Sequence, residues 1–353
     1  MLSGFDLDLS LWVALAVAAV ICGFFIAARV HYLAIPKLSA VNAASSPADC
    51  MVVIPARNEE FFIARAVSSF PHDTVIVVDD QSEDRTAEAA RKAGAGVMPA
   101  PEPARGAVGK ANACMAGARV LNSHWILFAD ADTWFAPGFL ESAVACAEAS
   151  SLAFLSIYLA PEPAGWTERL LAPYAAALYF CGITPRGDPT AIFNGQCLLV
   201  QREPYEFVGG HAAVLNTLVE DVRIAALARR HRLKFATART DSLGHIRFRE
   251  VSATVRRGSL RFMLVSLWIG IAILAAALAA ALWLPVLVWL ILDDQRLAAG
   301  IFAILPSLLL LPWYRSWRAV LAPIAIYAML PILFHSAIGA LVGRPVEWKG
   351  RTI

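Results

Sequence analysis

The hydrophobic pattern divides the chain into apolar ends and a mixed middle. Leu11–Ala28 is an uninterrupted apolar run, just long enough for one membrane crossing. Further apolar runs lie near the other end of the chain, at Phe262–Leu292, Leu297–Leu311 and Ala319–Val342. The pattern therefore predicts one membrane-spanning helix before the middle part and about three after it.

Within the middle part, short apolar runs alternate with helix-like stretches. We predict strands at Met51–Ile54, Thr74–Val78, Gly96–Met98 and Trp125–Ala129, because these runs are short, continuous and followed by polar residues. Helices are expected between and after them, for example at Lys110–Leu121. Since parallel strands need crossover connections that cover the faces of a sheet, this order predicts an α/β fold. The expected architecture is a mostly parallel, Rossmann-type sheet with helices on both faces.

Other elements are expected at less regular intervals. A helix is predicted over Glu59–Phe70, and Ser82 is expected to cap the next helix, which would end near Ala93. The apolar stretch Leu170–Phe180 is expected at the membrane surface. A further helix with a basic end is predicted over Glu220–Arg230.

Charged residues beside the apolar runs predict how the chain crosses the membrane. Asp6 and Asp8 precede the first run, whereas Arg29 and Lys37 follow it. Because basic residues favour the cytoplasmic side, the middle part is expected in the cytoplasm. The side of the membrane on which the C-terminus lies stays open. Four crossings place the C-terminus outside, whereas Arg344, Lys349 and Arg351 favour the inside.

Composition agrees with a membrane protein that carries a globular domain. Of the 353 residues, 58% are hydrophobic, and the mean hydropathy of +0.59 is too high for an ordinary soluble protein. The formal net charge of +2 gives no reason to expect a nucleic-acid partner. The cysteines show no metal-binding spacing, which fits a reducing compartment. We expect an anchor at 1–38, a linker at 39–49, an α/β domain at 50–245, a basic interface helix at 246–261 and a region of about three spans at 262–353.

Two carboxylates follow the strand expected at Trp125–Ala129. Asp130 and Asp132 are separated by one residue, so in extended chain both side chains lie on the same side. Mg²⁺ and Mn²⁺ prefer such oxygen ligands, and open α/β sheets bind ligands beyond the carboxyl ends of their strands. The pair therefore predicts a metal site. The alternative is that Asp132 caps the following helix and Asp130 is only solvated.

Four further stretches carry polar residues at the ends of expected strands or the starts of expected helices. The first strand runs into a turn that contains Arg57, and Asp79 and Asp80 end a neighbouring strand, where a carboxylate can bond to a nucleobase or ribose. Lys110 lies at a helix N-terminus, which favours a diphosphate. Glu220 and Asp221 begin a helix, and one of them could act as a general base. Each stretch taken alone also fits a turn, a cap or a solvated charge.

Taken together, these motifs resemble the family 2 glycosyltransferases of the GT-A fold. Val-Ile-Pro-Ala-Arg-Asn-Glu, Val-Val-Asp-Asp-x-Ser, Gly-Lys-Ala-x-Ala, Asp-Ala-Asp and Glu-Asp occur in that family's order and approximate spacing. The resemblance covers about Met51–Lys234. The flanking apolar runs and the closing Val346–Arg351 are similar to membrane-bound members that act on lipids. Those members include the hopanoid-associated and carotenoid glycosyltransferases and, more distantly, ceramide glucosyltransferase.

The resemblance implies a role for each matching residue. Lys110 would approach the diphosphate, and Asp130 and Asp132 would hold the nucleotide and a Mg²⁺ or Mn²⁺ ion. Asp221, with Glu220 beside it, would be the catalytic base. The residues that would line the nucleoside pocket are Pro55, Ala56, Arg57, Glu59, Asp79 and Asp80.

The resemblance also implies an activity. A single sugar would pass, with inversion, from a nucleotide-sugar, expected to be a UDP-sugar, to a hopanoid, carotenoid or glycolipid-like acceptor in the bilayer. Processive synthases carry Gln-x-x-Arg-Trp near the interface helix, whereas Thr254–Gly258 here lacks that Gln and Trp, which favours single transfer. The chain would be an integral protein of a bacterial inner membrane with its catalytic domain in the cytoplasm. A polyprenyl-phosphate acceptor, a nucleotidyltransferase and a non-catalytic nucleotide-sugar-binding scaffold remain alternatives, and the oligomeric state is open.

Overall fold

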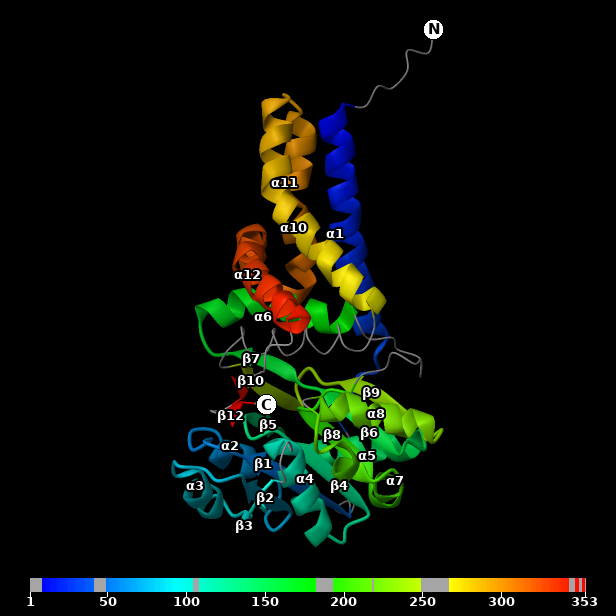
Figure 1. Ribbon diagram of the computed structural model, residues 1–353, viewed down its shortest axis with the longest axis vertical. Coiled ribbons are helices and arrows are strands. Elements are labelled where there is room, and N and C mark those ends of the chain that lie inside the picture. The colour runs from blue at the N-terminus through cyan, green and yellow to red at the C-terminus, as the bar shows by residue number, and fades with distance from the viewer. Residues whose placement is uncertain are drawn as a thin grey trace. The chain divides into compact units, whose positions relative to one another are not determined.

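The computed structural model describes residues 8–40, 49–103, 108–181, 193–217, 219–248, 267–342, 347–348 and 351–352. These residues form two compact units. One unit is helical and is built from both ends of the chain together with one helix from its middle. The other is an α/β unit that holds the residues expected to carry the chemistry (Figure 1).

The helical unit consists of long apolar helices and one helix that packs across them. It contains α1 (Leu9–Ala34), α6 (Trp166–Cys181), α10 (Leu267–Leu292), α11 (Arg296–Tyr314) and α12 (Ala322–Leu341), with a short turn η2 (Trp317–Leu321) before α12. Four of its helical segments, which correspond to α1, α10, α11 and η2 with α12, are long and apolar enough to cross a membrane. Within this unit, α6 contacts α1, α11 and α12.

The position of α6 is the main surprise of this unit. Its sequence lies between two strands of the α/β unit, yet its side chains bond to the apolar helices. The Tyr174 hydroxyl donates to the Ala322 carbonyl of α12 at 2.6 Å, and the Tyr314 hydroxyl of α11 donates to the Leu170 carbonyl. His31 of α1 bonds through Nδ1 to the Phe180 carbonyl at 2.9 Å. The chain thus leaves the α/β unit, contributes one helix to the apolar helices and returns.

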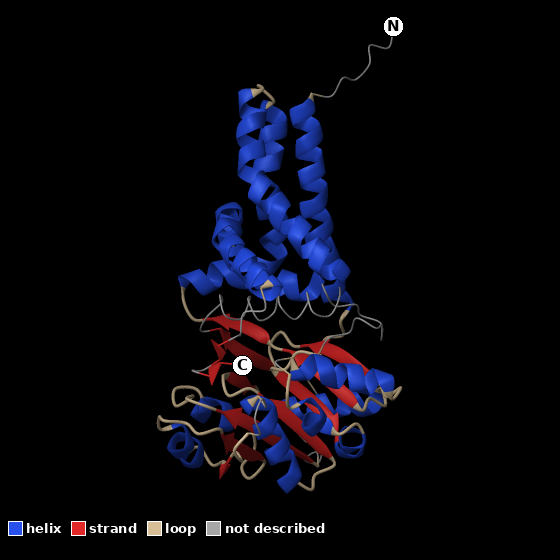
Figure 2. Ribbon diagram, viewed as in Figure 1, coloured by secondary structure: helices blue, strands red, loops and turns tan. Residues whose placement is uncertain are grey.

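The α/β unit is organised around a seven-stranded sheet, whose strands are red in Figure 2. Its strand order is β3-β2-β1-β4-β8-β6-β9. The neighbours β3, β2, β1 and β4 are parallel, as are β6 and β9, whereas β8 runs antiparallel to β4 and β6. The predicted mostly parallel sheet is confirmed. The bounds of the strands are β1 (Cys50–Ala56), β2 (Val75–Asp79), β3 (Gly96–Pro99), β4 (Trp125–Ala129), β6 (Phe154–Tyr158), β8 (Cys197–Gln201) and β9 (Phe235–Arg239).

Helices cover both faces of this sheet, as predicted. Alternation along β1 sends Val52 and Ile54 to one buried cluster and Val53 to the other, because successive side chains of a strand point to opposite faces. The first cluster includes residues of α2, α3 and α5, and the second includes residues of α4, α7 and α8. These helices are α2 (Ile63–Val67), α3 (Thr86–Lys92), α4 (Gly109–Val120), α5 (Phe139–Ala149), α7 (Arg202–Phe207) and α8 (Glu220–Arg230), with a 3₁₀ turn η1 (Gly210–Val214).

A small second sheet was not predicted. It has the order β5-β10-β7 and consists of β5 (Thr133–Phe135), β7 (Ala160–Pro163) and β10 (Gly244–Phe248). Residues 246–248, expected to open the basic interface helix, are therefore the end of a strand that pairs antiparallel with β5. The remainder of that expected helix, 249–261, lies outside the described residues. Near the C-terminus, β11 (Glu347–Trp348) and β12 (Arg351–Thr352) form a short hairpin.

Two local predictions in the α/β unit are wrong. The helix expected over Glu59–Phe70 is confined to α2, and Ser82 does not cap α3. Instead, the Ser82 hydroxyl accepts the backbone N–H of Asn58 at 3.0 Å, and Asp84 accepts the Thr86 N–H at 3.0 Å where α3 begins. Ser82 therefore joins the loop after β2 to the loop after β1 and does not cap α3. The helix α2 is shorter than predicted.

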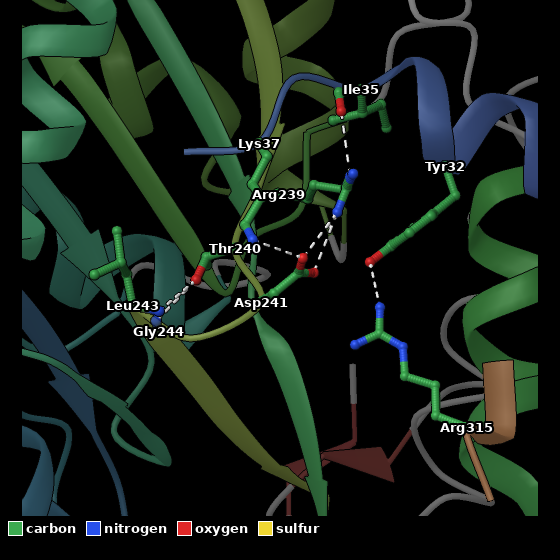
Figure 3. Close-up of polar contacts among 9 residues, drawn as sticks. All are labelled: Tyr32, Ile35, Lys37, Arg239, Thr240, Asp241, Leu243, Gly244 and Arg315. Carbon is green, nitrogen blue, oxygen red and sulfur yellow. Dashed lines mark hydrogen bonds and ion pairs between the residues drawn. The ribbon is translucent and has the colours of Figure 1, made fainter. Parts of the chain in front are cut away.

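The segment between α1 and β1 pairs with the edge strand β9 (Figure 3). The Leu38 N–H donates to the Arg239 carbonyl at 2.8 Å, so the segment extends the sheet. The Arg239 guanidinium donates to the Asp241 carboxylate at 3.2 Å and to the Ile35 carbonyl at 3.3 Å, while Lys37 Nζ lies 3.2 Å from the same carboxylate. One half-buried carboxylate therefore holds two cations from segments far apart in the sequence.

We expect Asp241→Asn to lower the melting temperature of the purified protein by about 2–4 °C, which corresponds to ~1 kcal/mol. The reason is that the amide keeps the shape of the carboxylate but no longer neutralises Arg239 and Lys37. Differential scanning fluorimetry in detergent measures the shift. Glu88→Gln is the control, because its ion pair with Lys92 is exposed and contributes little. Equal melting temperatures for the two variants would contradict the role given to Asp241.

Candidate active site

The expected site residues gather at one edge of the seven-stranded sheet. Because β1, β2 and β4 are parallel, their carboxyl ends lie at the same edge. Ala56 ends β1 beside Asp79, which ends β2. Asp130 directly follows β4, and Lys110 lies in the first turn of α4.

The Lys110 ammonium joins three parts of this edge. Its Nζ atom lies 2.6 Å from Asp130 Oδ1 and 3.5 Å from Glu220 Oε1, and it donates to the Gly195 carbonyl at 2.9 Å. Burial by itself lowers the pKa of Lys110, but the charges of Asp130 and Glu220 outweigh burial and raise the pKa. Lys110 therefore stays positively charged throughout the physiological range.

Asp221 is held from two sides by the backbone. Its Oδ2 atom accepts the N–H of Gly195 at 2.6 Å and its Oδ1 atom accepts the N–H of Val222 at 2.8 Å. Only 1% of Asp221 is exposed. A Cβ atom at position 195 would lie 2.9 Å from Asp221 Oδ2, so glycine is needed for this close approach.

The loop before β8 thus connects two of the predicted residues. Gly195 accepts from Lys110 through its carbonyl and donates to Asp221 through its N–H. The structure brings Lys110, Asp130, Glu220 and Asp221 together around it.

Hydrogen bonds join the loop after β1 to the loop after β2. The Arg57 guanidinium donates to the carbonyls of Asp80 at 2.7 Å and Gln81 at 3.4 Å, and the Asp80 N–H donates to the Ala56 carbonyl at 2.8 Å. Asp79 Oδ1 accepts the N–H of Ser82 at 3.3 Å. Arg57 therefore holds the loop after β2 against the loop after β1. Within the same pair of loops, Pro55 lies in β1 opposite Val78, and the Glu59 N–H donates to the Thr86 hydroxyl at 2.7 Å.

The backbone around the two aspartates after β4 is fixed by several hydrogen bonds. The Asp130 N–H donates to the Gln196 carbonyl, and the Asp132 carbonyl accepts the N–H of Arg247, both at 3.0 Å. The Thr133 hydroxyl donates to the Asp130 carbonyl at 2.7 Å. Asp132 therefore does not begin the next helix, since β5 lies between them.

The carboxylates of this edge suit a hard divalent cation by their chemistry. Across the described ranges, no group of three or more His, Cys, Asp or Glu side chains is arranged to hold a metal ion by itself. An ion held by Asp130 and Asp132 would therefore need further oxygen ligands from a bound substrate and water.

Sequence reasoning missed the residues that support Asp132 from the small sheet. Trp134 of β5 is buried, and the Arg65 guanidinium of α2 lies 3.6 Å from its ring centroid. The His245 ring of β10 lies nearly parallel to the Trp134 ring. The short run of one β-branched and two aromatic residues at Thr133–Phe135, directly after the aspartates, was the local indication of a strand there.

His211 of η1 is a buried histidine beside the charged cluster. Its Nδ1 atom lies 2.8 Å from the Tyr205 hydroxyl, and its ring packs against Phe128 of β4. Burial lowers the pKa of His211 to about 3, and the nearby charge of Lys110 adds to the effect. His211 is therefore neutral at physiological pH and helps to pack η1 against β4.

We expect this histidine to make the folded state less stable in mild acid. Below pH of about 6.5 the unfolded chain takes up a proton at His211, whereas the folded protein does not until the pH falls to about 3. Stability should therefore decrease by ~2 kcal/mol between pH 7 and pH 5 from this residue alone. Melting temperatures across that range measure the slope. His211→Phe should flatten it, whereas His72→Asn, a change at an exposed histidine, should not. Parallel slopes for all three proteins would contradict this account.

Three comparisons with known proteins bear on this site. Residues 51–208 match the sequence model of the family described as glycosyl transferase family 2. The chain is 41% identical over 87 residues to a 4,4'-diaponeurosporenoate glycosyltransferase of Staphylococcus haemolyticus, which is 23% of each chain. It is 28% identical over 213 residues to the enzyme of the same name from Staphylococcus aureus strain MRSA252, covering 56% of this chain and 55% of that one. The matches thus span about half or less of the length of these relatives.

The fold has a solved counterpart. The mannosyltransferase PcManGT from Pyrobaculum calidifontis, in complex with GDP-Man and Mn²⁺, superposes with a TM-score of 0.57 over 94% of this chain and 99% of its own. The sequence identity is 19%, so the likeness concerns the fold alone. It shows that the arrangement of strands and helices described above is that of the GT-A fold.

Proposed function

We propose that this chain transfers one sugar, with inversion, from a nucleotide-sugar to a lipid, and the match of residues 51–208 to the glycosyl transferase family 2 model supports the proposal. The observation that carries the proposal is the cluster around Gly195. It brings an ammonium, a strand-end carboxylate and a backbone-held carboxylate together around one short loop. A transferase needs a cation for the leaving diphosphate and a base for the acceptor hydroxyl, and these residues supply both.

The charges of the cluster favour a divalent cation in the working enzyme. A diphosphate would bring an excess of negative charge to the carboxylates of Asp130, Glu220 and Asp221, which lie near Lys110 and Gly195. A Mg²⁺ or Mn²⁺ ion held by Asp130 and Asp132 would neutralise this excess and the charge that develops on the leaving group. Lys110 fixes the Asp130 carboxylate in place for that purpose.

Asp221 is proposed to accept the proton of the acceptor hydroxyl. Its two backbone hydrogen bonds hold the carboxylate in one orientation, from which it would take the proton of the acceptor hydroxyl. The acceptor oxygen then attacks the anomeric carbon from the face opposite the diphosphate. Glu220, whose charge is paired with Lys110, is a positioning residue in this scheme.

The loops after β1 and β2 are proposed to bind the nucleoside. Pro55, Ala56, Arg57 and Glu59 come from the first loop, and Asp79 and Asp80 come from the second. The bonds from Arg57 to the second loop would keep the two walls of this pocket at a constant separation. A UDP-sugar is the donor that we propose, and a GDP-sugar is the alternative that the same chemistry accepts.

The acceptor is proposed to be a lipid because helices that are long and apolar enough to cross a membrane make up a whole compact unit. The Staphylococcus relatives are named as glycosyltransferases of 4,4'-diaponeurosporenoate, and we propose that the acceptor of this chain is likewise an apolar lipid, one whose sugar-receiving group is a hydroxyl. We also propose that the chain resides in a bacterial inner membrane with its α/β unit in the cytoplasm. If the acceptor were instead a polyprenyl phosphate, Arg256 and Arg257 would be candidates to hold its phosphate, and both lie outside the described residues.

Donor binding can be tested by the melting temperature of the detergent-solubilised chain with UDP, GDP, ATP and CTP, each with and without Mn²⁺. A ligand that binds only the folded state raises this temperature by mass action. At a nucleotide concentration of about 100 times Kd, the expected stabilisation is ~2.7 kcal/mol, with UDP and only in the presence of Mn²⁺. Asp132→Asn should abolish the Mn²⁺-dependent part, whereas Asp73→Asn, on an exposed turn, should retain it. No shift with any nucleotide would reject the proposed donor.

A further inference from the structure

Trp134 of β5 contacts side chains of two other elements. The strand register pairs it with His245 of β10, and the two rings are nearly parallel, with their centroids 5.8 Å apart. The Arg65 guanidinium of α2 lies 3.6 Å from the centroid of the Trp134 ring, and only 8% of Trp134 is exposed. Since an aromatic face attracts a cation at this distance, Arg65 ties α2 to β5.

The Glu162 carboxylate of β7 lies near the same arginine. Its Oε2 atom is 3.9 Å from Arg65 Nη2, and its Oε1 atom is 3.8 Å from Arg247 Nη1 of β10. Both distances are long and all three side chains are partly exposed, so the ion pairs by themselves contribute little to stability. They show, however, that Arg65 contacts the small sheet at two of its strands, β5 and β7.

The backbone position of Asp132 depends on the pairing of β5 with β10. Asp132 directly precedes β5, and its carbonyl accepts the N–H of Arg247 at 3.0 Å, which continues the pairing beyond Thr133 and Ile246. A shift of β5 would therefore move Asp132 with it. Because Trp134 follows closely in the same strand, the contact with Arg65 restrains that shift.

The helix α2, which carries Arg65, continues the other half of the candidate site. It packs against β5 and follows the loop after β1. The Glu59 carbonyl of that loop accepts the N–H groups of Phe62 and Ile63, both at 3.0 Å, where α2 begins. Arg65 therefore links the loop proposed to bind the nucleoside with the strand that follows the proposed metal ligands.

We propose that Arg65 is a positioning residue that couples the metal site at Asp132 to the nucleoside loops. The inference rests on the proposed function, in which Asp132 holds a divalent cation and the loops hold the nucleotide. Arg65 acts through Trp134, by fixing β5 relative to α2. An ion that orders Asp132 then also favours the loop arrangement that binds the nucleotide, and the nucleotide favours the ion by the same factor.

Mn²⁺ titrations of the UDP-induced melting shift measure this coupling in the full chain in detergent, with GDP used instead if GDP is the nucleotide that stabilises the wild type. The Mn²⁺ midpoint is the concentration that gives half of the shift. In Arg65→Gln the midpoint should rise about tenfold, because the amide provides no cation for the Trp134 ring. Arg65→Lys keeps a cation but loses the flat guanidinium, so its midpoint should lie between the two.

The matched control is Arg91→Gln, the same change at an exposed arginine of α3. Its midpoint should equal that of the wild type. A purely structural role of Arg65 would lower the melting temperature without ligands and leave the midpoint in Arg65→Gln unchanged, and that result would overturn the proposal.

A double-mutant cycle tests whether Arg65 acts through Trp134. Trp134→Leu removes the ring and should raise the Mn²⁺ midpoint by about the same factor as Arg65→Gln. The double variant should then show no more than about a tenfold rise, because the two changes remove one contact. A rise of about a hundredfold in the double variant would overturn the proposed route through Trp134.

Hydrogen exchange of the chain without ligands separates this inference from the proposed function. Peptides that cover residues 130–136 should exchange about tenfold faster in Arg65→Gln than in the wild type, and at the wild-type rate in Arg91→Gln. Unchanged exchange in Arg65→Gln would overturn the positioning role whatever the nucleotides do. Absence of any nucleotide-induced shift in the wild type would reject the proposed function, and the exchange rates would still decide whether Arg65 fixes β5.

Discussion

Replacing Asp221 by asparagine is expected to reduce the rate of sugar transfer by about a thousandfold, within the range for loss of a general base. The amide cannot accept the proton of the acceptor hydroxyl. It also presents N–H groups to one of the two backbone donors, Gly195 or Val222, that now bond to the carboxylate. The donor-side contacts of Lys110 and Asp130 remain, so nucleotide binding should be nearly unchanged.

The measurement for Asp221→Asn combines a transfer assay with the nucleotide-induced melting shift. Asp73→Asn serves as the control, because Asp73 lies on an exposed turn with a φ of +62°, which asparagine also tolerates. If Asp221→Asn lost nucleotide binding together with transfer, the role of the Asp221 carboxylate would be to hold the Gly195 loop and not to take the proton.

Replacing Lys110 by methionine is expected to have the largest effect on stability. Asp130 and Glu220 would lose the ammonium that lies 2.6 Å and 3.5 Å from them, and the Gly195 carbonyl would lose a donor. Removing one member of a buried charge cluster costs ~3 kcal/mol, and transfer should fall below detection at the same time. The melting temperature and the transfer rate are the two measurements.

Lys92→Met is the matched control for this substitution, because Lys92 forms an exposed ion pair with Glu88. It should leave both measurements nearly unchanged. A stable Lys110→Met protein with full transfer would show that the carboxylates of the site do not depend on this ammonium.

The parts of the fold that were predicted correctly depend on local pattern. The strands β1, β2 and β4 are short, continuous apolar runs, and α8 begins and ends at the expected residues Glu220 and Arg230. Parallel order follows from the helices between such strands. The site edge could therefore be located from sequence, because Asp79, Asp80, Asp130 and Asp132 stand at or just after the ends of apolar runs.

The parts that were missed depend on contacts between distant segments. The pairing of β5 with β10 joins residues 133–135 to 244–246, and no local pattern predicts that partner. The contacts of α6 with α1, α11 and α12 also could not be predicted from local pattern, because its apolar residues suit both a membrane surface and a helix packed among others. Lys110 was expected beside a diphosphate, and a sequence cannot show that Asp130 and Glu220 lie close enough to bind it.

The central claim is that this chain moves a sugar from a nucleotide to a lipid, and one assay tests it most directly. Membranes that contain the wild-type chain or Asp221→Asn are incubated with Mn²⁺ and radiolabelled UDP-glucose or GDP-mannose, and the lipid is then extracted into organic solvent. The account predicts label in the organic phase for the wild type with one of the donors, and about a thousandfold less for Asp221→Asn. Label that stays in the aqueous phase with every donor, or equal organic label for both proteins, would contradict it.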